Sequence, residues 1–299
     1  MRVHVSVPAT SANLGPGFDT LGLALALHNE VVAEEAERVT VSVAGEGAGR
    51  LPADDTNVVA RGVRLAYEAA GRRFRGVRLE CVNRVPAARG LGSSAAAWVG
   101  GLTAGNTLLG SPLDRDGLVG LAARAEGHPD NVAAAVFGGL TVACPTAAGV
   151  SAVSLPVPRE LQWVVLVPEV TSATADARAV LPAAVPRADA VFNVQRVALL
   201  LASLQAGRVT ALAAALDDRL HQPYREKLFP WMPGVVAAAR AAGALGCVLS
   251  GAGPSLLAVV AGDAARVARA MEDALRGAGI AGAARALAVD THGAVARAV

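Results

Sequence analysis

A glycine-rich segment near residue 90 constrains the fold of this chain more than any other feature. It runs Arg-Gly-Leu-Gly-Ser-Ser-Ala-Ala-Ala over residues 89–97, between an apolar strand pattern at 77–82 and an alanine-rich helical pattern. A strand, a glycine turn and a helix start place unpaired backbone N–H groups and the positive end of a helix dipole around one point. Glycines let a ligand approach the backbone, and serine hydroxyls add donors or metal ligands. The segment therefore predicts a phosphate-binding loop.

Two other interpretations of this loop stay open. Gly90–Ala95 fits the dinucleotide pattern G-x-G-x-x-A, but residues 84–89 separate it from the strand, and the first downstream acids, Asp114 and Asp116, follow a second turn. A Walker loop is excluded because it needs a lysine after its last glycine, and the only lysine is Lys227. The other alternative is a glycine turn that only packs a helix on a sheet. The serines at the helix start favour phosphate.

Composition excludes several classes of protein. Hydrophobic residues make up 53% and charged residues 17%, which argues against disorder, and no apolar run reaches the roughly 18 residues that would span a membrane. A net charge of +2 without a basic tail predicts no nucleic-acid partner. The first residues lack the apolar core of a signal peptide, so we predict a cytoplasmic location. The three dispersed cysteines are predicted to be free thiols rather than a disulfide or zinc site.

Periodicity predicts an α+β chain with two domains, 1–150 and 151–299. In the first half we predict strands at 2–8, 20–28, 30–34, 39–44 and 77–82, and a further strand that starts at the glycines 138–139 and runs through 144. We predict helices at 57–70, 93–109, 113–126 and 129–137. In the second half we predict strands at 163–168, 246–250, 255–261 and 284–289, and helices at 190–206, 209–220, 233–242 and 263–278. This order indicates an α+β sandwich with an antiparallel sheet, and residues 145–158, rich in Pro, Gly, Ser and Ala, indicate the link.

Four further groups of residues have a structural interpretation, and three of them also allow a functional one. Segment 8–19 is a long turn, or it binds a polar substrate through Asn13 and Asp19. Segment 126–131, Glu-Gly-His-Pro-Asp-Asn, is a pair of helix caps, or its glutamate binds Mg²⁺ together with Ser94. Segment 250–255 is a tight turn between strands. The fourth group comprises two arginines that are surface residues or carboxylate clamps, Arg178 and Arg225.

Taken in chain order, segments 8–19, 86–97 and 249–255 resemble the three signatures of the GHMP small-molecule kinases. The strings PATSANLGPGFD, RGLGSSAAA, EGHPDNVA and QPYR are typical of the branch that phosphorylates homoserine. The resemblance covers nearly the whole chain. It implies an N-terminal domain like the second domain of ribosomal protein S5 and a ferredoxin-like C-terminal domain. It also implies transfer of phosphate from ATP to L-homoserine, which gives ADP and O-phospho-L-homoserine for threonine biosynthesis, and relatives suggest a homodimer.

The resemblance implies roles for individual residues. Mg²⁺ would be held by Ser94 and Glu126, and Gly251 to Ser255 would lie near the meeting point of the two substrates. The residues expected at ATP are Asn57, Pro86, Ala87, Ala88, Arg89, Gly90, Leu91, Gly92, Ser93, Ser94, Ala95 and Ala96. The residues expected at L-homoserine are Asn13, Asp19, His128, Asn131, Thr174, Arg178, Arg225 and Gly253.

Asn131 bears on the mechanism. Several relatives in the superfamily are thought to have an aspartate base at this position, and an amide cannot accept the proton. The resemblance therefore implies that Asn131 only orients the hydroxyl, which suffices for a loose phosphoryl-transfer transition state. Asp130 is predicted to cap a helix, with a role as base as the alternative. Another acceptor, such as mevalonate, a sugar or a diphosphocytidyl alcohol, and a binding protein without catalysis remain alternatives. The combination of Asp19 with two arginines favours an amino acid.

Overall fold

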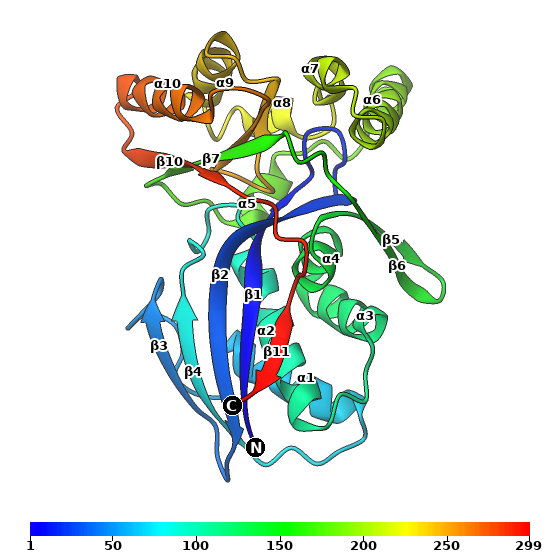
Figure 1. The fold of residues 1–299 in the computed structure, drawn as a ribbon, viewed down its shortest axis with the longest axis vertical. Helices are drawn as coiled ribbons and strands as arrows, with labels where there is room; N and C mark the ends of the chain where they lie inside the picture. Colours follow the sequence, from blue (N-terminus) through cyan, green and yellow to red (C-terminus); the bar gives the residue numbers. More distant parts are fainter.

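Two β-sheets, stacked end to end, organise the chain (Figure 1). The computed structural model describes residues 1–299. The first sheet has the order β11-β1-β2-β4-β3, with β5 on β2 and β6 on β5, and only β3 and β4 are parallel. The first and last strands pair, so the two chain ends lie side by side. Its strands are β1 (Arg2–Ala12), β2 (Leu21–Glu35), β3 (Thr40–Gly45), β4 (Val77–Asn83), β5 (Leu140–Thr146), β6 (Gly149–Leu155) and β11 (Val295–Ala298).

Four helices build the core of this half. Helices α2 (Ser93–Leu108) and α4 (Asp130–Phe137) pack on β1 and β2, while α1 (Val58–Ala69) and α3 (Arg115–Glu126) pack against α2. Helix α2 is buried on almost all sides, because its sequence is rich in alanine and glycine and its neighbours approach closely. The predicted phosphate loop thus ends at a helix that the core holds rigidly.

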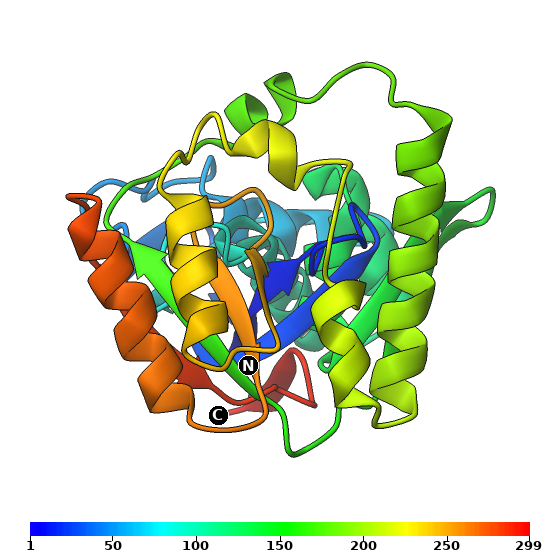
Figure 2. The same ribbon diagram turned by 90° about the horizontal axis from the view of Figure 1, so that it is seen from above.

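The second sheet has the order β10-β7-β9-β8, with every neighbouring pair antiparallel. This order follows from a strand–helix–strand–strand–helix–strand connection, as in ferredoxin-like domains. In Figure 2, α9 and α10 lie next to each other at one edge of this half of the protein, and α6 lies at the opposite edge. The elements are β7 (Gln162–Pro168), α5 (Thr174–Ala179), α6 (Arg187–Gln205), η1 (Val209–Ala211), α7 (Leu212–Ala215), α8 (Gln222–Arg225), α9 (Met232–Ala241), β8 (Gly246–Leu249), β9 (Leu256–Val260), α10 (Ala264–Gly277) and β10 (Gly282–Leu287).

Several sequence predictions need correction. Segment 145–158 is not a linker, because most of it forms the β5–β6 hairpin, and the strands predicted at 20–28 and 30–34 are one strand, β2. The helix predicted at 209–220 ends at residue 215, because the Asp218 carboxylate accepts hydrogen bonds from the N–H groups of the next turn. The division at residue 150 falls inside β6, and β11 returns to the first sheet. We propose that the second domain starts after β6 and ends before β11.

A shared apolar cluster joins the two halves. Leu21, Leu23 and Leu25 of β2 pack with Trp163 of β7 and Val259 of β9. Because this cluster is continuous, the loops at the facing ends of the two sheets are held close together. None of the helices combines the length and the apolar character needed to cross a bilayer.

Candidate active site

The three segments singled out in the sequence meet at the junction of the two sheets. The Thr10 N–H donates to Leu91 O, and the Gly251 N–H donates to Ala12 O, both at 3.1 Å. The Ser250 hydroxyl donates to Gly90 O at 2.6 Å and lies 2.8 Å from the Ser11 hydroxyl. Segments far apart in the sequence are thus joined by direct hydrogen bonds.

The glycine loop has the geometry of an anion site. Gly92 is the N-cap of α2, with φ of 67° and no side chain that caps the helix. The first hydrogen bond of the helix runs from the Ala96 N–H to Gly92 O, so the N–H groups before it have no acceptor within the helix. A Cβ atom at Gly92 would lie 1.9 Å from the Thr10 hydroxyl oxygen. The free N–H groups and the helix dipole at this point favour a phosphate.

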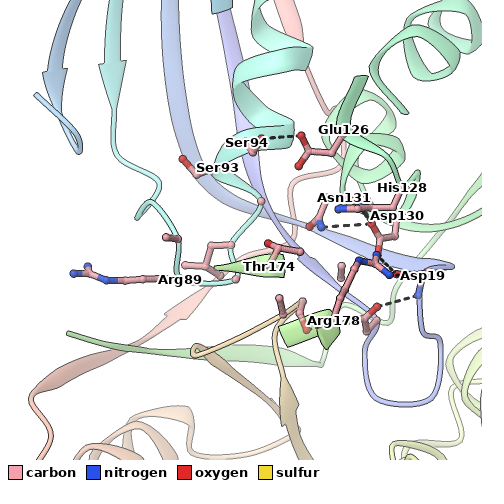
Figure 3. A pocket seen from close by; sticks show the side chains of 18 of the residues that line it. Asp19, Arg89, Ser93, Ser94, Glu126, His128, Asp130, Asn131, Thr174 and Arg178 are labelled. Carbon is pink, nitrogen blue, oxygen red and sulfur yellow. Dashed lines mark hydrogen bonds and ion pairs between the residues drawn. The ribbon is translucent and has the colours of Figure 1, made fainter. Parts of the chain in front are cut away.

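A cleft opens in front of the loop. It brings together sixteen of the residues predicted for the site, from both halves of the chain (Figure 3). They are Asn13, Asp19, Pro86, Ala88, Arg89, Gly90, Leu91, Gly92, Ser93, Ser94, Glu126, His128, Asn131, Thr174, Arg178 and Arg225. The guanidinium of Arg89 points away from Glu126 and Asp19 in Figure 3.

A second pocket adjoins the cleft at Ala88, Ser93 and Ser94. It contains Asn57 and Ala87 of the predicted ATP residues, and its wall is half apolar. The Asn57 side chain is already engaged, because Oδ1 accepts the Val59 N–H at 2.9 Å and Nδ2 donates to Pro52 O at 2.7 Å. Asn57 therefore shapes the pocket as the N-cap of α1.

Three predicted site residues line neither pocket. Ala95 and Ala96 are buried in the core cluster of the first half, and only their backbone is near the loop. At Gly253 a Cβ atom would lie 2.7 Å from the Phe229 ring, so this residue faces the apolar core of the second half of the chain. From the third segment, Gly251 and Ala252 line the cleft instead. The resemblance implied the whole turn from Gly251 to Ser255, and the structure brings its first two residues, but not Gly253, to the cleft.

Ser94 and Glu126 face each other across the cleft wall. The Ser94 hydroxyl donates to Glu126 Oε2 at 2.7 Å, and this glutamate forms no ion pair. Burial raises the pKa of Glu126, while the hydrogen bond from Ser94 acts in the opposite direction. A half-buried carboxylate beside a hydroxyl, with no cation of its own, suits a hard metal ion that keeps water or phosphate oxygens as its other ligands.

Asp130 is a buried carboxylate of the cleft, and the sequence predicted it as a helix cap, with a role as base as the alternative. Its Oδ1 lies 2.7 Å from His128 Nδ1 and accepts the Asn131 N–H at 2.7 Å. The hydrogen bond to Asp130 raises the pKa of His128. The predicted cap is misplaced, because Pro129 is the N-cap and Asp130 is the first helical residue. Asn131 Oδ1 accepts from the Thr10 hydroxyl at 2.8 Å, which fixes the orientation of the amide.

The charged residues predicted for the substrate occupy the other end of the cleft. Asp19 and Arg178 form a bidentate ion pair at 2.8 and 3.0 Å, and both side chains are more than a third exposed. Arg225 is only 2% exposed and donates to neutral acceptors alone. Burial, together with nearby Arg178, lowers the pKa of Arg225 to about 10, so it stays charged at neutral pH. A buried cation that lines a cleft without a direct ion-pair partner is costly unless a ligand supplies the anion.

Sequence reasoning missed two residues behind these arginines. The Phe18 ring stacks on His221 with centroids 5.1 Å apart, and both guanidinium groups lie within 6 Å of it, at 5.8 Å for Arg178 and 5.5 Å for Arg225. Phe18 lies within the predicted turn 8–19, and His221 precedes the QPYR string. Each was next to a recognised motif, but nothing in the sequence indicated that the two rings meet.

This fold, with a phosphate loop between two α/β halves, defines a small-molecule kinase of the GHMP class. Models of the GHMP kinase N-terminal and C-terminal domains match residues 57–139 and 200–277. The chain belongs to the GHMP kinase family. A homoserine kinase of Moorella thermoacetica is 46% identical over 97% of this chain and 98% of that protein. A homoserine kinase of Trichormus variabilis is 45% identical over 98% of each chain.

The solved structures agree with this assignment. The crystal structure of homoserine kinase from Cytophaga hutchinsonii superimposes with a TM-score of 0.91 and 31% identity, covering 99% of this chain and 97% of that one. The two-domain fold expected from the sequence is therefore confirmed.

Proposed function

We propose that this protein transfers the γ-phosphate of ATP to the side-chain hydroxyl of L-homoserine, which yields ADP and O-phospho-L-homoserine for threonine biosynthesis. The observation that carries this proposal is the buried, unpaired Arg225 in the same cleft as the phosphate loop. Arg225 provides for a carboxylate and Asp19 for an amine, so an amino acid with a hydroxyl suits the cleft better than a sugar or mevalonate. The homoserine kinases among its relatives support the same substrate.

The phosphates of ATP would bind at the start of α2. There the loop residues Ser93 and Ser94 offer backbone N–H groups and hydroxyls, and the adjoining pocket beside Asn57 accepts the nucleoside. Glu126 and the Ser94 hydroxyl would hold Mg²⁺, which neutralises charge on the phosphates. This donor set leaves room for water and phosphate oxygens, as Mg²⁺ requires.

The amino-acid substrate would lie between the two charged groups of the cleft. Asp19, on the loop with Asn13, would meet the amine, and Arg225 with Arg178 would bind the carboxylate. Thr174 lies one helical turn before Arg178 and faces the same space (Figure 3). This arrangement would direct the hydroxyl of the substrate toward His128, Asn131 and the phosphate loop.

Orientation and charge neutralisation would drive the transfer. The Asn131 amide is fixed through Thr10 and cannot take the proton, so it can only align the hydroxyl through a hydrogen bond. A loose transition state needs little activation of the nucleophile. Asp130 lines the same cleft beside Asn131, and turnover of an Asp130→Asn variant tests whether it acts as the base. The cytoplasmic location and the homodimer stay predictions.

The direct test is ADP release by the purified protein with Mg·ATP and one acceptor at a time. We expect release with L-homoserine well above that with L-serine, mevalonate, galactose or no acceptor, and O-phospho-L-homoserine by mass spectrometry. ATP binding without release on L-homoserine, or faster release with another acceptor, would refute the proposed substrate.

A further inference from the structure

A buried polar cluster lies directly behind the cleft, and of its members only Arg225 also lines the cleft. It consists of Asp218, His221 and the inner side of Arg225, and all three are almost completely buried. Polar groups at such depth are retained where each has a hydrogen-bond partner.

Arg225 is held by three neutral acceptors. Its Nε donates to Ala177 O at 3.1 Å, and its Nη1 lies 3.1 Å from Gly251 O and 3.1 Å from His221 Nδ1. The remaining nitrogen, Nη2, takes part in none of these bonds, and Arg225 lines the cleft. The guanidinium is thus fixed on its inner side and leaves one N–H₂ group for a ligand.

The bonds of His221 define its tautomer. Its Nε2 lies 2.8 Å from Gly15 O, which can only accept, so the hydrogen is on Nε2 and Nδ1 is a free acceptor for Arg225. Burial lowers the pKa of His221, which favours this neutral form; the charged groups around it are Asp218, Arg225 and Asp19. Phe18 covers the ring, and Asp218 accepts the backbone N–H of His221 at 3.1 Å.

We propose that His221 is a positioning residue for substrate binding: its Nδ1 fixes the Arg225 guanidinium so that Nη2 meets the substrate carboxylate, and its Nε2–H fixes the loop that carries Asp19. This inference rests on the proposed function, since it assigns Arg225 to the carboxylate. His221 links the two ends of the substrate site, because Gly15 belongs to the loop between Asn13 and Asp19. Asn193 holds the same loop through Pro16 O at 3.1 Å.

Two conservative substitutions separate the two bonds. Asparagine carries its amide at about the distance of Nδ1 from the backbone, so His221→Asn keeps an acceptor for Arg225 and loses the bond to Gly15. Glutamine reaches the position of Nε2, so His221→Gln keeps a donor for Gly15 and loses the acceptor for Arg225. His4→Gln, a histidine of β1 outside the cleft, is the matched control.

For His221→Gln we expect the KM for L-homoserine to rise about tenfold, as for one lost hydrogen bond to a charged group, with kcat and the KM for ATP nearly unchanged. His221→Asn should raise this KM by no more than about threefold, because Asn193 still holds the loop through Pro16 O, although the melting temperature falls. In an Arg225→Met background, His221→Gln should cause no further rise, because it acts only through Arg225. With 3-aminopropan-1-ol, which lacks the carboxylate, His221→Gln should not change the KM.

Three results would overturn the inference: an unchanged KM in His221→Gln, equal rises in both His221 variants, or full additivity with Arg225→Met. If His221→Gln does not fold, a crystal structure of the wild type with L-homoserine decides, because the inference requires the carboxylate on Nη2 and the Nη1–Nδ1 contact intact. Absence of turnover and of calorimetric binding of L-homoserine in the wild type would instead refute the proposed function itself.

Discussion

Replacing Gly90 with alanine tests whether the phosphate loop must contact segment 249–255. Gly90 has φ of 73°, and a Cβ atom would lie 2.2 Å from the Ser250 carbonyl oxygen. The left-handed backbone costs an L-residue about 1–2 kcal/mol, and an overpacked contact costs about 1–3 kcal/mol more. We expect Gly90→Ala to reduce the free energy of unfolding by about 2–5 kcal/mol. The KM for ATP should rise, because the loop must move away from Ser250.

Gly49 provides a matched control. Its φ is 70°, and a Cβ atom there would meet nothing within 4 Å. Gly49→Ala therefore carries the backbone cost of about 1–2 kcal/mol without the contact. Urea unfolding of both variants, together with the KM for ATP, separates the two contributions. Equal losses of stability in the two variants, with an unchanged KM for ATP in Gly90→Ala, would refute the role assigned to the contact.

Three further predictions concern single side chains. Glu126→Gln keeps the shape of the residue but removes its charge, so kcat should fall by about a hundredfold or more, and near-normal turnover at saturating Mg²⁺ would exclude Glu126 as a ligand. Asp130→Asn should retain much of kcat if the hydroxyl needs no protein base; loss of turnover with intact folding and binding of both substrates would assign the base to Asp130. Burial raises the pKa of Cys81 and Cys247 to about 12, so a thiol reagent at pH 8 should label only the exposed Cys144 in the native protein, and denaturation should expose the other two.

Local sequence signals predicted the framework of the site. The glycine turn before α2, the αL glycine that ends α3 at Gly127 and the strands with alternating burial are set by neighbouring residues, and all were found. The short elements α5 and α8 were missed because helices of four to six residues have too few turns to show a period. The strand β11 was missed because it depends on pairing with β1 at the other end of the chain.

The charge network of the site could not be predicted in the same way. The sequence indicated Asp19, Arg178 and Arg225 as separate substrate contacts, yet Asp19 pairs with Arg178 across 159 positions. The His221–Gly15 bond spans 206 positions. Such partners are set by how the two sheets are joined through the shared apolar cluster, and no local pattern records that geometry.

The two arginines should contribute unequally to carboxylate binding. Arg178 already pairs with Asp19 in a half-exposed position, so substrate binding exchanges one ion pair for others, and exposed pairs contribute only about 0–1 kcal/mol. Arg225 is buried and forms no direct ion pair, so the substrate carboxylate should gain about 1.5–3 kcal/mol there. We therefore expect Arg225→Met to raise the KM for L-homoserine by about ten- to a hundredfold, and Arg178→Met by less than about fivefold, because it also frees Asp19 for the amine. Equal effects of the two substitutions on this KM would contradict the argument that burial without a partner sets the affinity.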